Sequence, residues 1–107
     1  MFRRSAPQDL INATERNLQP IVQKYLDKGI NPNVRTHIDP WYQGLQLLAL
    51  AAIHGHVDLL KLLLERGAKV DGLDLSRRTA LSWAAEHCQY GAVKVLVEHG
   101  PMSMQRM

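Results

Sequence analysis

The sequence is poor in cysteine, in aromatic residues and in long apolar runs, and each shortage excludes a class of protein. The single cysteine, Cys88, has no partner for an internal disulfide, which fits a reducing compartment. Aromatic residues make up 6% of the chain, so aliphatic side chains and alanine must supply the core. The N-terminus lacks the apolar run of a signal peptide, and no apolar run approaches a membrane span. We therefore expect an intracellular protein, cytoplasmic or nuclear, with no membrane span.

Basic residues are in slight excess, but they are not concentrated in one region. The formal net charge is +3, and the arginine pairs Arg3–Arg4 and Arg77–Arg78 stand far apart in the chain. A nucleic-acid-binding domain normally gathers its basic residues into a stripe or patch. Nucleic acid is therefore not an expected partner. A chain of 107 residues is long enough for one domain, which we assign to 1–107.

The chain repeats itself with a period of 33 residues. Shifting it by that length aligns eight identical pairs, which are Leu48/Leu81, Ala51/Ala84, Ala52/Ala85, His54/His87, Lys61/Lys94, Leu63/Leu96, Glu65/Glu98 and Gly67/Gly100. A weaker copy lies upstream, with Gly29 in the place of Gly67 and five extra residues between Asn33 and Leu48. The sequence therefore predicts three copies, at about 7–33, 42–71 and 75–100, followed by a tail at 101–107.

Each copy has the pattern of two short helices. Leu48, Ala51 and Ala52 share one face of a first helix, because residues three and four apart lie together on a helix. A second helix is predicted from about Val57 to Arg66 and is apolar on most of its circumference. Neither is long enough to be stable alone, so the copies must stack. Thr79 is a good N-cap for the first helix of the third copy.

These residues resemble the ankyrin repeat. The third copy reads Thr79-Ala80-Leu81-Ser82-Trp83-Ala84-Ala85, similar to the family signature T-P-L-H-x-A-A. The second copy has the matching Gly55-His56, Leu63-Leu64 and Gly67-Ala68. The resemblance implies an all-α solenoid of three helix-turn-helix repeats with an enlarged first inter-repeat loop. It also implies non-catalytic recognition of another protein, with no cofactor.

The sequence departs from that signature at several positions. Ala49 and Ser82 replace the signature histidine, and Cys88-Gln89 replaces Gly-His in the third copy. Cys88 would be strained if its backbone is left-handed. The tail carries no obvious polar cap, although solenoids need one for solubility. Three explanations stay open: the tail folds back, the chain is a fragment, or the uncapped last repeat mediates self-association.

The partner-binding residues are implied by alignment with the variable positions of the family. They are Arg35, His37, Trp41, Tyr42 and Gln43 of the long loop, Ile53 and His54 of the second copy, and Leu75, Ser76, Arg78, Glu86 and His87 of the third. Trp41 and Tyr42 would anchor the partner, with Arg and His side chains orienting it. An equal alternative is that this aromatic pair covers the junction between the first two repeats. For Trp83, which also occupies a variable position, packing is favoured over binding.

Other functional classes are weaker interpretations of the same residues. His54, His56, His87 and Cys88 occupy equivalent positions on successive repeats, which is the wrong spacing for one metal site. His56 is better explained as a structural histidine that hydrogen-bonds the backbone. Ser82, His87 and Cys88 do not have the spacing of a catalytic triad, so no enzyme activity is expected. The alternative function is a structural or targeting repeat segment of a longer multidomain protein.

Overall fold

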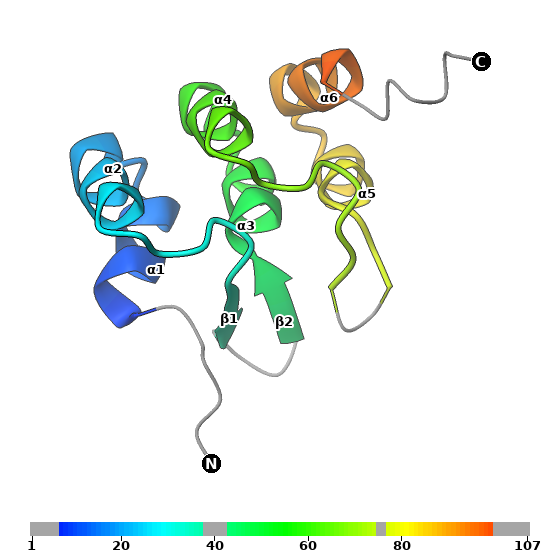
Figure 1. Cartoon of the computed structure of the whole chain (residues 1–107). Helices are drawn as coiled ribbons and strands as arrows, with labels where there is room; N and C mark the ends of the chain where they lie inside the picture. The colour runs from blue at the N-terminus through cyan, green and yellow to red at the C-terminus, as the bar shows by residue number, and fades with distance from the viewer. Residues whose placement is uncertain (1–6, 38–42, 75–76, 100–107) are drawn as a thin grey trace.

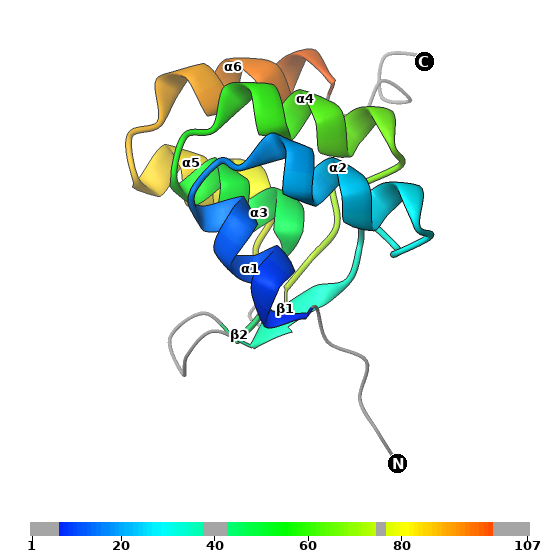
Figure 2. The same cartoon turned by 90° about the vertical axis from the view of Figure 1, so that its left-hand side faces the viewer.

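The computed structural model describes residues 7–37, 43–74 and 77–99, apart from the side chains of His37 and Gln43. Three pairs of helices follow one another in this part of the chain: α1 (Gln8–Glu15) with α2 (Gln19–Asp27), α3 (Leu47–Ile53) with α4 (Val57–Glu65), and α5 (Ala80–Glu86) with α6 (Tyr90–Glu98). The first helices form one layer and the second helices form another (Figure 1). Figure 2, which looks along the row from α1 and α2, shows the pairs stacked behind one another. The predicted all-α repeat solenoid is thus confirmed.

The five extra residues fall in a small β-hairpin between the first two helix pairs. Strand β1 (Arg35–His37) pairs antiparallel with β2 (Gln43–Gln46), and an irregularity interrupts the register between Arg35 and His37. Thr36 is fully buried, and its hydroxyl donates a 2.9 Å hydrogen bond to the Leu45 carbonyl. The enlarged loop is therefore anchored at its base, and β2 continues directly into α3.

Helix α3 forms the centre of the core. All seven of its residues are buried, because it packs between α1 and α5 in one layer and against α4 in the other. Ala51 and Ala52 are fully buried, and their small side chains let the neighbouring helices approach closely. Helix α4 ends at Glu65, with Arg66 as its C-cap. Although α4 is apolar on most of its circumference, only part of that circumference is fully buried. Leu59, Leu60 and Leu63 are buried, whereas Leu62 and Leu64 are only partly covered.

The turn between the two helices of each repeat has a left-handed residue at the same position. These residues are Asn17 (φ 59°), Gly55 (φ 70°) and Cys88 (φ 57°). The predicted strain at Cys88 is confirmed, because a left-handed backbone is costly for a residue with a Cβ atom. At the far end of α4, Gly67 adopts φ 100°, and its N–H donates to the Leu64 carbonyl. A left-handed glycine just after a helix is a common way for the helix to end.

One side-chain hydrogen bond ties the second repeat to the first, and an equivalent bond ties the third repeat to the second. His56 Nε2 lies 2.7 Å from the carbonyl oxygen of Glu15, so that nitrogen carries the proton. In the next repeat, Gln89 Nε2 donates to the carbonyl oxygen of Ile53 at 2.8 Å. Both carbonyls end a first helix, where backbone acceptors have no partner inside the helix. The prediction of a structural His56 is confirmed, and Gln89 takes the same role where histidine is missing.

Candidate interaction surface

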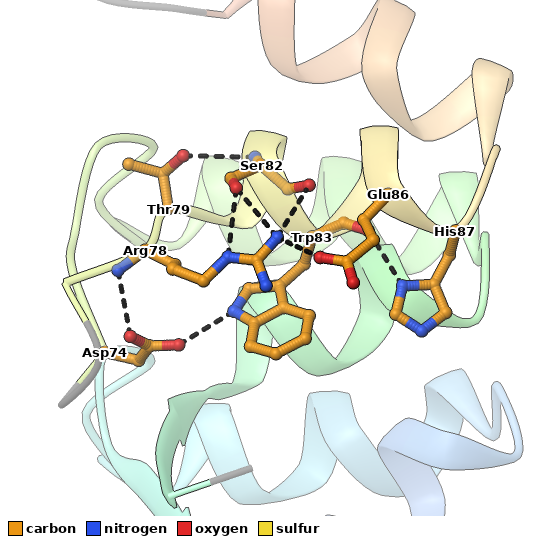
Figure 3. Close-up of polar contacts among 7 residues, drawn as sticks. All are labelled: Asp74, Arg78, Thr79, Ser82, Trp83, Glu86 and His87. Carbon is orange, nitrogen blue, oxygen red and sulfur yellow. Dashed lines mark hydrogen bonds and ion pairs between the residues drawn. The ribbon is translucent and has the colours of Figure 1, made fainter. Parts of the chain in front are cut away.

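The third repeat carries a cluster of polar side chains on α5 and the loop before it (Figure 3). Its central contact is the indole N–H of Trp83, which donates a 2.7 Å hydrogen bond to Asp74 Oδ2. Both residues are buried, with exposed fractions of 8% for Trp83 and 7% for Asp74. The favoured packing role of Trp83 is thus confirmed, because the ring is held between the helix and the loop.

Asp74 also organises the turn that leads into α5. Its other carboxylate oxygen accepts a 2.9 Å hydrogen bond from the backbone N–H of Arg78. Its carbonyl accepts from the N–H of Arg77, and its own N–H donates to the carbonyl of Arg78. Thr79 then caps the helix, accepting from the N–H of Ser82 at 3.2 Å as predicted. One buried carboxylate therefore fixes both the loop and the tryptophan ring.

Arg78 lies across the face of the tryptophan. Its guanidinium carbon is 3.9 Å from the ring centroid of Trp83, a cation–π geometry. Nε and Nη2 donate to the hydroxyl of Ser82 at 3.1 and 3.0 Å, and Nη2 also forms an ion pair with Glu86. The side chains of Arg78 and Glu86 remain 29% and 55% exposed. A fixed pair of opposite charges is therefore presented at the surface.

His87 extends the cluster to the end of α5. Its Nδ1 lies 3.0 Å from the carbonyl oxygen of Trp83, and its ring centroid lies 6.0 Å from that of Trp83. The structure thus brings together three of the predicted contact residues, Arg78, Glu86 and His87, around one buried tryptophan. Sequence reasoning missed Asp74 as their organiser. The signal was a single acidic residue five positions before a helix cap, which is too common to be specific.

His54 lies at the equivalent position of the second repeat and is exposed. Its ring stacks on that of His56, with centroids 5.6 Å apart. Partial burial lowers the pKa of His54, the charges of His56 and His87 lower it further, and Glu15 opposes them. The ring is therefore biased toward its neutral form, in which it both donates and accepts hydrogen bonds.

The other predicted contact residues have different surroundings. Arg35 is partly buried, donates to the carbonyl of Gly44 at 2.9 Å, and lines a hollow of about 550 Å³ beside Pro7 and Val34. Ile53, one of the predicted contact residues, is only 6% exposed, as all seven residues of α3 are buried. His37 and Gln43 lie on the hairpin strands. The remaining predicted contacts, Trp41, Tyr42, Leu75 and Ser76, lie outside the described residues.

The cluster offers hydrogen bonds and charge rather than an activated nucleophile. The hydroxyl of Ser82 accepts hydrogen bonds from the guanidinium of Arg78, a group that offers donors and no acceptor. Within the described ranges, no three His, Cys, Asp or Glu side chains gather closely enough to hold a metal ion. No helix in that same part of the chain is long and apolar enough to cross a membrane.

A family model of ankyrin repeats, comprising three copies, matches residues 10–106. The match covers most of the chain, and the chain therefore belongs to the ankyrin repeat family. Members of this family generally mediate protein–protein interactions and are typically non-catalytic.

Proposed function

We propose that this chain is a non-catalytic interaction module that holds another protein against its inter-repeat loops and the concave face formed by its first helices. The observation that carries the proposal is the fixed arrangement of Arg78, Glu86 and His87 around Trp83. Side chains already held in place lose little conformational freedom when a partner binds, so their contacts add more to affinity.

The charges suggest the chemistry of the partner surface. Arg78 and Glu86 form an exposed pair of opposite sign, and His54 and His87 add hydrogen-bonding rings on adjacent repeats. A complementary partner presents an acidic and a basic group side by side, flanked by polar groups. Trp41, Tyr42, Leu75 and Ser76, which lie outside the described residues, remain predicted contacts of the same partner. An intracellular location, cytoplasmic or nuclear, is part of this proposal and is supported by the single cysteine.

The proposal is tested by affinity capture from the native host with Glu86→Lys. This change reverses one charge of the exposed pair and costs little folding stability, because half-exposed ion pairs contribute about 1 kcal/mol or less. Glu65→Lys is the matched control, since it makes the same charge change at an exposed position of α4. We expect wild type and Glu65→Lys to retain one protein that Glu86→Lys loses. Equal capture by all three would contradict binding at this surface.

A second function, as a structural or targeting segment of a longer multidomain protein, is favoured by the exposure of Leu81 and Val97 on the last repeat. In a longer array another repeat would cover these side chains. A native protein or transcript longer than this sequence would support that alternative.

A further inference from the structure

The outer side of the first repeat carries a groove between its two helices, which we call the α1/α2 groove. It is a hollow of about 430 Å³, and its apolar lining consists of Ala13 from α1 with Leu18, Ile21 and Tyr25 from the start and middle of α2. Leu18 and Ile21 are each 40% exposed. Helices α1 and α2 stand at one end of the row, so in the described part of the chain no further helix covers this side (Figure 2).

Three cations surround the apolar lining. Arg16 follows the end of α1, Lys24 lies in the last turn of α2, and Lys28 is the C-cap of α2. All three line the groove and are exposed. Among the described residues that line it, Asp9 is the one acidic side chain. The groove therefore combines apolar surface with an excess of positive charge.

The other acidic residues of the first repeat act on the opposite side, toward the second repeat. Asp27 forms an ion pair with Arg66 at 2.8 Å. The charge of Glu15 acts on the ring of His54. None of the three cations of the groove takes part in an ion pair with another described residue. Their charge is therefore available to a ligand.

The second repeat shows what the same positions do when something lies against them. Arg66 stands at the position of Lys28, and it pairs with the carboxylate of Asp27 on the preceding repeat. Leu59 stands at the position of Ile21 and is fully buried. One repeat along, these positions therefore contact an acidic group and apolar groups, whereas in the first repeat they are open.

We propose that the α1/α2 groove binds an acidic amphipathic segment of another protein. Apolar side chains of that segment enter the groove, and its carboxylates pair with Arg16, Lys24 and Lys28. Apolar grooves between helices accept amphipathic helices in this manner, and opposite charges at the rim set the orientation of the partner. The groove lies at the end of the row and shares no residue with the cluster around Trp83, so it is a second site, independent of the function proposed above.

Two other occupants fit the groove less well. A preceding repeat in a longer array would bury Asp9 and Asn12 against apolar groups, because these exposed residues stand where the second repeat has buried leucines. An anionic membrane offers negative charge, but a flat surface cannot enter a hollow between two helices. A peptide segment can fill the hollow and leave the rim in water.

The test begins with a displayed library of random peptides of about 15 residues, a length at which an isolated helix becomes possible. The library is selected on the full chain and counter-selected on Lys24→Glu/Lys28→Glu. We expect the enriched peptides to carry leucine, isoleucine or phenylalanine at helical spacing together with several acidic residues. Enriched peptides without acidic residues would overturn the proposal. So would a library from which no peptide distinguishes the two proteins.

The affinity of the most enriched peptide is then measured by isothermal titration. Lys24→Glu should raise its Kd by about tenfold or more, because it sets like charges together at the rim. Lys61→Glu makes the same change at an exposed position of α4 and should alter the Kd by less than about twofold, because solvent screens distant exposed charges. Circular dichroism checks that each variant is folded. Equal weakening by both variants would show a general charge effect and contradict binding in the groove.

Two further measurements separate this site from the alternatives. Glu86→Lys, on the surface around Trp83, should bind the peptide as wild type does, so failure of one proposal leaves the other testable. Vesicles of phosphatidylcholine and phosphatidylserine should not retain the protein. Retention that Lys24→Glu/Lys28→Glu abolishes would assign the cations to a membrane surface and overturn the peptide site. A native transcript that encodes another repeat ahead of the first would also overturn it, because that repeat would fill the groove.

Discussion

At the scale of single residues, two equivalent hydrogen bonds between neighbouring repeats each depend on one side chain. Gln89 reaches across to the last carbonyl of α3 and replaces the histidine that does this in the second repeat. The two side chains differ in shape, but each places an N–H donor within 3 Å of a carbonyl that its own helix leaves unpaired. The requirement at this position is therefore for a donor and not for an imidazole.

Gln89→Ala should lower the free energy of unfolding by about 1–2 kcal/mol, because it leaves the Ile53 carbonyl without its partner. Gln89→His should recover most of that loss, as His56 makes the equivalent bond. Urea denaturation monitored by circular dichroism provides the measurement. Gln23→Ala, at an exposed position of α2, is the control and should have little effect. A loss that histidine does not rescue would show that the bond is not the cause.

His54 gives the protein a pH dependence whose sign is fixed by its surroundings. Its pKa in the folded protein lies below the ordinary 6.5, chiefly because of partial burial. The unfolded chain therefore takes up the proton first as pH falls through 6.5, and folding stability decreases until the folded form is also protonated. We expect wild type to lose more stability than His54→Gln between about pH 7.5 and 5.5. Parallel stability curves for the two proteins would contradict this expectation.

At the scale of elements, the end of α4 depends on the backbone of Gly67. Its φ of 100° is accessible to glycine and strained for other residues, while the space around it is open, with Pro32 Cγ at 4.0 Å from an added Cβ. Gly67→Val should therefore destabilise the fold by about 1–2 kcal/mol through backbone strain alone. Gly67→Asn should cost less, because asparagine tolerates left-handed conformations. Equal melting temperatures for wild type and Gly67→Val would refute this account.

The packing between helix pairs depends on alanine. Ala51 is fully buried, since α3 lies between α1 and α5. Ala51→Glu would bury an unpaired charge there and should destabilise the protein by about 3 kcal/mol or more. Lys61→Glu introduces the same residue on the exposed side of α4 and serves as the comparison. An unchanged melting curve for Ala51→Glu would contradict the observed packing.

At the scale of the whole molecule, the proposed partner surface joins residues from more than one repeat. The predicted contact residue Trp41 is part of that proposal and lies outside the described residues. Trp41→Ala should reduce partner capture with little change in melting temperature if the side chain contacts the partner. A marked fall in melting temperature would instead support the alternative in which Trp41 covers the junction between the first two repeats. Phe replacement, which keeps an aromatic ring, should retain more of either property.

Sequence alone predicted the repeats, the helix pairs, the Thr79 cap and the strain that a left-handed turn imposes at Cys88. These features follow from local rules, because helix periodicity, capping and glycine geometry involve residues only a few positions apart. It could not predict that Gln89 replaces a histidine contact, since that bond joins residues 36 positions apart. Nor could it predict that Ile53, named as a partner contact, is buried. The exposure of Ile53 depends on how α1 and α5 pack against α3, and these helices are distant in the chain.

The composition and period of the sequence determined that this protein is a short row of stacked helix pairs, because helices this short must bury their apolar faces on equivalent neighbours. Only the tertiary structure decided which charged residues act together. Asp74 is one acidic residue among ten in the sequence, and burial beside Trp83 makes it the group that holds the loop, the ring and, through its turn, Arg78. The reason is physical: hydrogen bonds and ion pairs act over a few ångströms in space, whatever the distance along the chain.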